Sequence, residues 1–346
     1  MKIKESKTKK SIPTFELFSQ YMDFKSSFFN LLAPVIRALE DNPTITKLQL
    51  CEELLNRVSN SLLKNESVRT EELLLFVYTI IQRGVHMAVK VQINDERAER
   101  DYGQKKKDVF LRTKHQYKEM TYSVDMKWKK TGQQLTDKKT QEICGRVLGS
   151  FGLQCLKRAL KNTQLILKDH QKEDNIDDTP VAAPEDDLKA KLDPFVPVLL
   201  DSFKTYHNPI IVTTLHVLGQ LIPLALPTFK DLMKKFLNKL FKLFEQSGPA
   251  SNNNDNIDFL NSLFRCTAEL IRTYGTYQDL SQPQIKTLVH LIKQHLNSTS
   301  TQTNVFHCLR AIVYRRFICA DLYDLLETVQ DLMITSLAKS TRGICA

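Results

Sequence analysis

The stretch that decides the fold is Leu192-Asp193-Pro194-Phe195-Val196-Pro197-Val198-Leu199-Leu200-Asp201. Apolar residues recur at steps of 3, 4, 7, 8 and 11 from its start, at Leu192, Phe195, Val196, Leu199, Leu200 and Phe203. This spacing predicts one apolar stripe along a helix. After Asn208-Pro209, which favours a turn, a second stripe follows at Ile211, Leu215, Leu218 and Ile222. Together the stripes predict a helical hairpin that buries its seam against itself and its neighbours.

Similar openings recur toward the end of the sequence. They begin at Phe229, Ile285 and Leu322, so the successive starts, counted from Leu192, lie 37, 56 and 37 residues apart. The long interval contains an asparagine-rich insert over residues 246–258. A period of about forty residues with two helices per unit is typical of HEAT and armadillo arrays. We therefore expect an all-α fold, an α-solenoid of HEAT- or armadillo-like helical hairpins.

Changes in periodicity and charge divide the rest of the chain. The stretch from Asp169 to Asp187 holds eight carboxylates and almost no large apolar residue. Such a segment cannot bury enough surface to offset its ordering entropy, so we expect a flexible linker. The expected divisions are helical repeats at 1–94, a basic and poorly ordered excursion at 95–141, a helical repeat segment at 142–168, the acidic flexible linker at 169–190, and HEAT-like repeats at 191–346.

Positive charge is concentrated in one segment. The chain has a formal net charge of +10, and residues 97–139 contain thirteen Lys or Arg against six Asp or Glu. Cations beside aromatic side chains are the mixture that contacts RNA phosphates and stacks on bases. The candidate RNA- or partner-binding residues are Lys105, Lys106, Lys107, Arg112, Lys114, Lys127, Trp128, Lys129 and Lys130. The same pattern also fits a solvated loop or a nuclear-import signal, and Trp128 could instead anchor the segment on the solenoid.

No arrangement of residues predicts catalysis. Gly145, Gly149 and Gly152 are not followed by Gly-Lys-Ser/Thr, so close helix packing explains them better than phosphate binding. The eight histidines form no His-x-x-x-His pattern and join no Cys-x-x-Cys pair, which leaves zinc binding without local support. We expect no enzyme, no catalytic residue, no cofactor, no metal and no small-molecule substrate.

The sequence also bears on membranes and redox environment. Residues 206–229 contain no charged side chain, but Pro209, Pro223 and Pro227 interrupt them, so we expect a buried repeat helix and a turn rather than a membrane span. The basic N-terminus lacks the apolar core of a secretory signal. Seven scattered cysteines indicate reduced thiols in a cytosolic or nuclear protein.

Three segments in the same order resemble a known family. They are the decisive stretch at 192–201, the preceding helix marked by Phe151-Gly152-Leu153 with Leu156 and Leu160-Lys161, and the basic run Lys105-Lys106-Lys107-Asp108-Val109-Phe110-Leu111. The chain resembles the down-regulated-in-metastasis family, also called small nucleolar RNA-associated protein 20, whose members are very large HEAT-repeat proteins. Because family members are several times longer, the resemblance implies that this chain corresponds to one internal part.

The resemblance also implies a function. The implied role is that of a scaffold without catalysis in the nucleus and nucleolus, acting in ribosome biogenesis and small-subunit (18S-type) pre-ribosomal RNA processing within the small-subunit processome. The implied partners are pre-ribosomal RNA and small nucleolar ribonucleoprotein or processome proteins, with no membrane. The alternative is a HEAT-type adaptor of another class, such as a nuclear transport receptor or phosphatase scaffold, which binds proteins in a concave groove.

Overall fold

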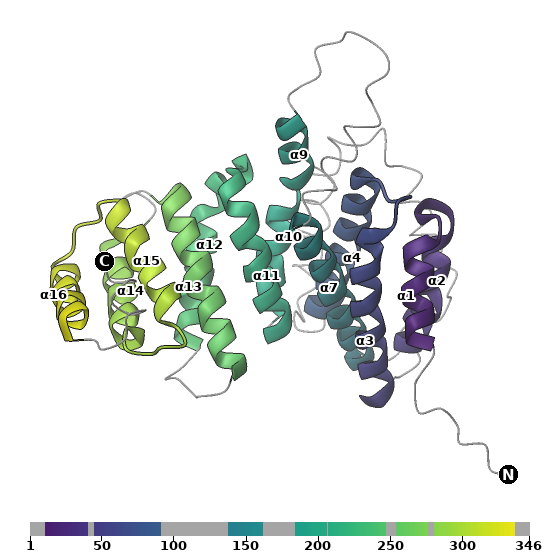
Figure 1. The fold of residues 1–346 in the computed structure, drawn as a ribbon, viewed down its shortest axis with the longest axis horizontal. Coiled ribbons are helices and arrows are strands. Elements are labelled where there is room, and N and C mark those ends of the chain that lie inside the picture. Colours follow the sequence, from purple (N-terminus) through teal and green to yellow (C-terminus); the bar gives the residue numbers. More distant parts are fainter. Residues whose placement is uncertain are drawn as a thin grey trace, which may run out of the picture. The chain divides into compact units, whose positions relative to one another are not determined.

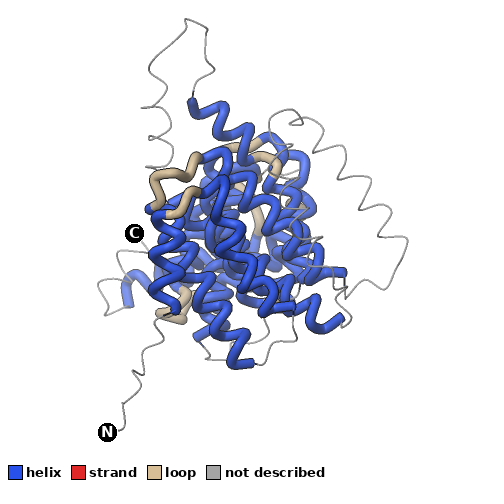
Figure 2. The backbone as a smooth tube through the Cα atoms, turned by 90° about the vertical axis from the view of Figure 1, so that its right-hand side faces the viewer, coloured by secondary structure: helices blue, strands red, loops and turns tan. Residues whose placement is uncertain are grey.

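The computed structural model describes residues 11–40, 45–90, 138–161, 184–205, 207–246, 254–275 and 280–335. In these ranges the chain forms helices joined by loops and contains no strand (Figures 1 and 2). The chain divides into two compact units, unit 1 at residues 1–213 and unit 2 at residues 214–346. The division falls inside one helix, whereas the sequence suggested a boundary near residue 190. The predicted all-α fold of solenoid-type helical hairpins is confirmed.

Unit 1 is built from helices that pack around α4 and α7. Its elements are α1 (Ser11–Tyr21), α2 (Phe24–Glu40), α3 (Ile45–Ser61), η1 (Leu62–Lys64), α4 (Thr70–Lys90), α7 (Lys138–Lys161), α9 (Pro184–Leu192), α10 (Phe195–Ser202) and η3 (Phe203–Thr205). The ring of Phe76 on α4 lies edge-on to Phe28 of α2, with centroids 5.3 Å apart, and to Phe151 of α7, at 6.3 Å. All three rings are buried, so this cluster joins α2, α4 and α7 into one core.

Glycines let α4 and α7 approach backbone to backbone. A Cβ atom on Gly84 of α4 would lie 2.3 Å from the backbone nitrogen of Gly149 on α7. One on Gly145 would lie 2.5 Å from the backbone nitrogen of Ala88, and one on Gly152 would lie 2.7 Å from Cγ1 of Ile81. No side chain fits at Gly84 or Gly145, where the nearest atom belongs to the backbone of the other helix, so close helix packing, which the sequence predicted for the α7 glycines, is confirmed.

The decisive stretch forms two helices rather than one. Leu192 ends α9, Asp193 and Pro194 form a turn, and α10 begins at Phe195. Pro194 has no N–H to continue the hydrogen-bond ladder of α9, which explains the break. The apolar stripe survives it, because Leu192, Phe195, Val196, Leu199 and Phe203 are all buried. Asn208 and Pro209 also differ from expectation, since they are the first residues of the next helix, where a proline suits the first turn.

Helix α9 lies partly in the stretch that we expected to be a linker. It begins at Pro184, so residues 184–190 are helical. Lys191 holds this helix in place: its ammonium lies 2.5 Å from Oε1 of Glu71 on α4 and also pairs with Asp187 one turn earlier. Burial alone would lower the pKa of Lys191, but its hydrogen bonds to Asp187 and Glu71 and their charges raise it above the ordinary value.

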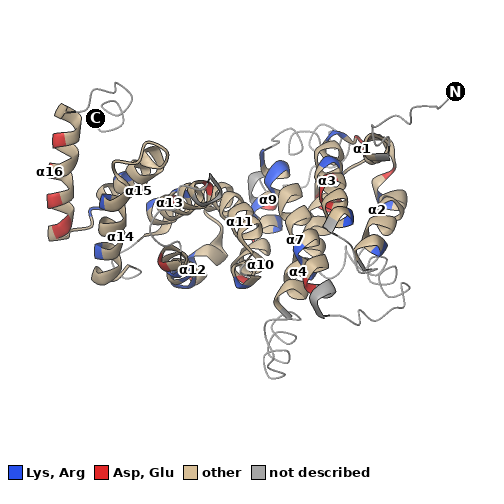
Figure 3. Ribbon diagram, turned by 90° about the horizontal axis from the view of Figure 1, so that it is seen from below, with Lys and Arg blue, Asp and Glu red and all other residues tan. Residues whose placement is uncertain are grey.

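Unit 2 continues with hairpins of the same kind. Its elements are α11 (Asn208–Leu221), which begins in unit 1, η4 (Ile222–Leu224), α12 (Pro227–Gln246), α13 (Asn254–Tyr274), α14 (Gln282–His295), α15 (Gln302–Tyr314) and α16 (Ala320–Thr335). Helix α13 packs on α15, α12 packs on α13, and α14 packs on both α15 and α16. Helices α12 and α14 thus form an outer layer over α13 and α15 (Figure 3).

Two apolar stretches have the length of a membrane span. Residues 70–89 of α4 are long and apolar enough to cross a membrane, and 61% of their most apolar window is buried inside the structure, as in a core helix. The other stretch, residues 206–229, is described from His207 onward. It divides into α11, η4 and the start of α12, with Ala225 at φ 55° between them, which confirms the predicted helix and turn.

Candidate nucleic-acid interface

The nine residues predicted to contact RNA, which begin at Lys105 and end at Lys130, lie in segment 91–137, outside the described residues. Their role therefore stays a prediction. Within the described ranges, the strongest feature with the right chemistry is a second basic surface on α12. We call it the α12 lysine face and define it by four exposed side chains: Lys230, Lys234, Lys235 and Lys242.

The lysine face follows from the amphipathic pattern of α12. Lys234, Lys235 and Lys242 lie within about 100° of one another around the helix, and Lys230 borders them near its start. Four residues correspond to a rise of about 6 Å along the axis. The opposite side is apolar and buried from Phe229 to Phe244. The helix therefore has a fixed inner face and a solvent face rich in ammonium groups.

Aromatic contacts fix the inner side of α12 on α13. The ring of Phe229 lies 5.8 Å from that of Tyr274, and the ring of Phe244 lies 5.0 Å from that of Phe264. Tyr274 also donates a hydrogen bond of 3.1 Å to the carbonyl oxygen of Leu226, just before α12 begins. Because both ends of α12 are anchored, its lysines project from a rigid support.

The charge of the lysine face is not neutralised. Asp231 and Glu245 are exposed on the same helix, yet in the described part of the chain no carboxylate lies within ion-pair distance of the four lysines. The neighbouring α14 carries no carboxylate and adds exposed Lys293, whereas its Lys286 pairs with Asp321 of α16 at 3.8 Å. A hydrogen bond of 3.1 Å from Nε2 of Gln284 to Oδ1 of Asn238 connects the two helices.

This surface is suited to phosphate rather than to bases. A lysine ammonium is a compact charge with three donors and no acceptor, so it binds phosphate oxygens without selecting a base. The lysine face contains no aromatic side chain on which a base could stack. We expect binding that depends on salt and little on sequence.

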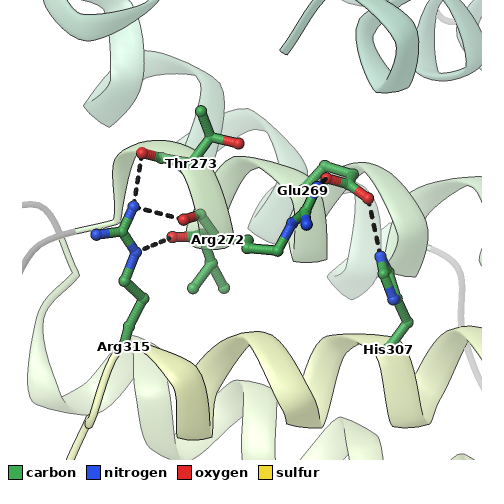
Figure 4. Close-up of polar contacts among 6 residues, drawn as sticks. Glu269, Arg272, Thr273, His307 and Arg315 are labelled. Atoms are coloured by element: carbon green, nitrogen blue, oxygen red, sulfur yellow. Dashed lines mark hydrogen bonds and ion pairs between the residues drawn. The ribbon is translucent and has the colours of Figure 1, made fainter. Parts of the chain in front are cut away.

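A polar cluster of Glu269, Arg272 and His307 links α13 to α15 (Figure 4). Nε2 of His307 lies 2.9 Å from Oε1 of Glu269, and Nη2 of Arg272 donates to Oε2 of Glu269 at 2.7 Å. Burial alone would raise the pKa of the Glu269 carboxyl, but the hydrogen bonds from His307 and Arg272 and their charges hold it below its ordinary value of 4.5. The contact between Glu269 and His307 therefore crosslinks the two helices.

Arg315 closes the other end of the same helix pair. Its Nε donates to the carbonyl oxygen of Ile271 at 3.1 Å, and its Nη2 donates to those of Thr273, at 2.6 Å, and Arg272. The last carbonyls of a helix have no partner within the helix and carry partial negative charge. Arg315 thus caps the C-terminus of α13 from the end of α15.

The described residues offer little to catalysis. Burial raises the pKa of the Cys155, Cys266 and Cys308 thiols to about 12, so they are protonated at neutral pH and poor nucleophiles. Cys308 follows His307 in sequence, but it is fully buried whereas His307 reaches Glu269. In the ranges that the structure covers, no three His, Cys, Asp or Glu side chains could hold a metal ion together.

The α12 lysine face was not predicted from the sequence. Residues 229–241 were interpreted only as an apolar stripe, because a basic region was expected where many Lys and Arg lie close together in the sequence. The missed signal was the placement of Lys234, Lys235 and Lys242 on the side of the helix away from that stripe. A helical projection of α12 would have found it.

Comparisons with known proteins find similarity to relatives that are named for a small nucleolar RNA. The family model for the U3 small nucleolar RNA-associated protein 20 domain matches residues 1–81. Over 346 residues, or 99% of its length, the chain is 22% identical to U3 small nucleolar RNA-associated protein 20 of Saccharomyces cerevisiae, of which it covers 12%. It is 21% identical to the protein of that name from Schizosaccharomyces pombe, of which it covers 11%. The resemblance inferred from the sequence is confirmed, and the chain spans only about an eighth of these relatives.

Proposed function

We propose that this chain, which is similar along its whole length to one part of U3 small nucleolar RNA-associated protein 20, acts as a scaffold without catalysis in ribosome biogenesis. It would take part in small-subunit pre-ribosomal RNA processing within the small-subunit processome, in the nucleolus. Its partners would be pre-ribosomal RNA and small nucleolar ribonucleoprotein or processome proteins.

One observation carries this proposal. Two relatives named for their association with U3 small nucleolar RNA align with 99% of the chain. The alignment covers both units, so it is not confined to one repeat.

The charge of the chain supports contact with RNA. The α12 lysine face presents four unneutralised ammonium groups on a rigid helix. The basic excursion between residues 97 and 139 adds a net charge of +7, since it carries thirteen basic and six acidic residues. A protein that neutralises phosphates releases counterions, and this gives affinity without base recognition. Each of the two basic regions would contact RNA phosphates.

The helical architecture supports the scaffold role. Stacked helical hairpins provide long surfaces made from repeated elements, and such surfaces bind extended partners. The polar clusters that we describe, around Glu269, Lys191 and Arg315, connect helices to one another. They contribute to shape rather than to a reaction.

The test is recovery of partners from cells. The tagged chain is crosslinked to RNA with ultraviolet light and purified, and the proposal predicts precursors of the small-subunit RNA together with processome proteins. Replacement of Lys105, Lys106 and Lys107 by Gln should reduce crosslinked RNA severalfold. A control with the same loss of charge replaces exposed Lys25, Lys64 and Lys161 by Gln and should leave it unchanged. Recovery of nuclear-pore or phosphatase subunits in place of processome factors would reject the proposal.

A further inference from the structure

Helix α12 presents lysines to solvent without a side chain on which a base could stack. The helix contains no Tyr, Trp, His or Arg, and its phenylalanines, Phe229, Phe236, Phe241 and Phe244, are buried. Proteins that bind single-stranded RNA without sequence preference combine positive charge with aromatic side chains on which successive bases stack. The α12 lysine face has the charge of such a site and lacks its stacking surface.

Acidic residues do not interrupt the centre of this face. The carboxylates of α12, Asp231 and Glu245, lie near its two ends, and the helix carries no Asp or Glu between them. Lys234, Lys235 and Lys242 all lie within this interval. The distance from Lys234 to Lys242 corresponds to about 12 Å along the helix axis, so their ammonium groups can contact more than one phosphate.

Helix α14 extends the surface beside α12 without adding negative charge. Nε2 of Gln284 on α14 donates to Oδ1 of Asn238 on α12, in the middle of the lysine interval. Helix α14 contains no Asp or Glu, and it exposes the polar side chains of Thr287 and Gln294. Nothing on these two helices between Asp231 and Glu245 of α12 would therefore repel a phosphate backbone.

The rigidity of α12 favours a ligand that is also rigid. Aromatic contacts fix both ends of the helix on α13, between Phe229 and Tyr274 and between Phe244 and Phe264. A double helix already holds its phosphates in place, whereas a single strand must lose conformational freedom to place them on fixed lysines. A double helix also releases more counterions, about 0.9 per neutralised phosphate compared with about 0.7 for a single strand.

We propose that the α12 lysine face binds double-helical RNA through its phosphates and has little affinity for single strands. Proteins recognise double-stranded RNA mostly by its shape and by contacts to phosphates and 2′-hydroxyls, which require no access to the bases. The ammonium groups of Lys234, Lys235 and Lys242 contact the phosphates. This inference rests on the RNA contact of the proposed function and specifies the form of RNA that the face takes.

The experiment measures binding of the full chain to a fluorescent RNA duplex of about 20 base pairs and to one of its strands alone, chosen not to pair with itself. Replacement of Lys234, Lys235 and Lys242 by Gln should weaken binding of the duplex at least about tenfold, because each phosphate that loses its lysine keeps its counterions. Binding of the single strand should weaken less than about twofold, since the face offers no stacking surface.

Two further variants show that the loss comes from the face. The matched control replaces exposed Lys25, Lys64 and Lys161 by Gln, which removes the same charge and should leave binding of the duplex unchanged. Asp231→Asn removes a carboxylate beside the lysines and should strengthen binding of the duplex severalfold, whereas Asp324→Asn at an exposed position of α16 should not. A gain in affinity cannot arise from unfolding, and circular dichroism checks that each variant is folded.

The outcomes separate this inference from the proposed function. Equal weakening of duplex and single strand by the substitutions on α12, or equal effects of the two triple variants on the duplex, would overturn the inference and leave the RNA contact standing. Displacement of the duplex by polyglutamate at the same concentration of charge would also overturn it, because the face would then accept acidic protein equally well. Only failure of the unsubstituted chain to bind either form of RNA would contradict both.

Discussion

Two helix pairs of the molecule, α4 with α7 and α13 with α15, are held together by different kinds of contact. In unit 1, α4 and α7 approach so closely that Gly84 and Gly145 leave no space for a side chain. In unit 2, α13 and α15 are joined by polar side chains: Glu269 with His307, Asn261 with Asn304 at 2.9 Å, and Arg315 with the end of α13. The first helix pair depends on shape and the second on polar contacts. We expect them to respond to different perturbations.

The largest effect should come from filling the space between the glycines. Gly84→Val adds a Cβ that would lie 2.3 Å from the backbone of α7, so the two helices must separate. We expect a loss of about 3 kcal/mol or more in the free energy of unfolding of unit 1, because the backbone atoms of α7 cannot move aside as a flexible side chain can. Hydrogen exchange of individual segments measures this loss of stability. We expect faster exchange in α4 and α7 and little change in α13 and α15.

Gly219 provides the matched control. It lies inside α11, and a Cβ there would meet nothing within 4 Å. Gly219→Ala should therefore stabilise the protein by about 0.5–1 kcal/mol, through lower entropy of the unfolded chain. If Gly84→Val left exchange in α4 unchanged, the shape-based account of unit 1 would be wrong.

A smaller effect is expected at the charged helix pair. Arg315→Met removes three hydrogen bonds to the C-terminal carbonyls of α13 and leaves the flexible side chain otherwise similar in length. The expected loss is about 2 kcal/mol, as for hydrogen bonds that involve a charged group. Exchange should accelerate at the end of α13 and not in α4. Arg265→Met removes an exposed arginine from the middle of α13 and serves as the control, with no effect expected.

The smallest effect is a dependence on pH. The folded-state pKa of Glu269 lies below its ordinary value of 4.5, so its stabilising contribution is present above that pH and is lost as the pH falls through the folded pKa. Glu269→Gln should reduce the stability of unit 2 at pH 7, and the difference from the parent should shrink below pH 4.5. Thermal melts from pH 3 to pH 7 measure this. An equal difference at every pH would contradict the charge-based account, and the exposed Glu245→Gln is the control.

The contrast between the two pairs also shows what sequence could predict. The amphipathic stripes predicted the helices because burial follows apolar spacing, and Phe28, Val77 and Leu218 are buried as expected. Gly145 and Gly149 predicted close packing, yet nothing local identified Gly84 as their partner, since that approach depends on how two distant helices meet. The break at Pro194 was missed because the apolar spacing continues across it.

The candidate site was predicted less well than the fold. The high density of Lys and Arg predicted a binding segment at residues 97–139. Of this segment the structure describes only residues 138 and 139, at the start of α7. The α12 lysine face has no comparable density, because its lysines alternate with buried apolar residues and gather on one surface only when the helix forms.

The most direct test of the RNA-scaffold account measures binding of this chain to a transcript of the small-subunit precursor RNA at several salt concentrations. Replacement of Lys230, Lys234, Lys235 and Lys242 by Gln is compared with replacement of exposed Lys25, Lys64, Arg69 and Lys161 by Gln, which removes the same charge. If the α12 lysine face holds the RNA backbone, the first variant binds more weakly, and the slope of log affinity against log salt becomes about 3 units shallower, because each phosphate that a lysine neutralises adds roughly 0.7 to that slope. Equal affinity and equal slope for the two variants would contradict the account.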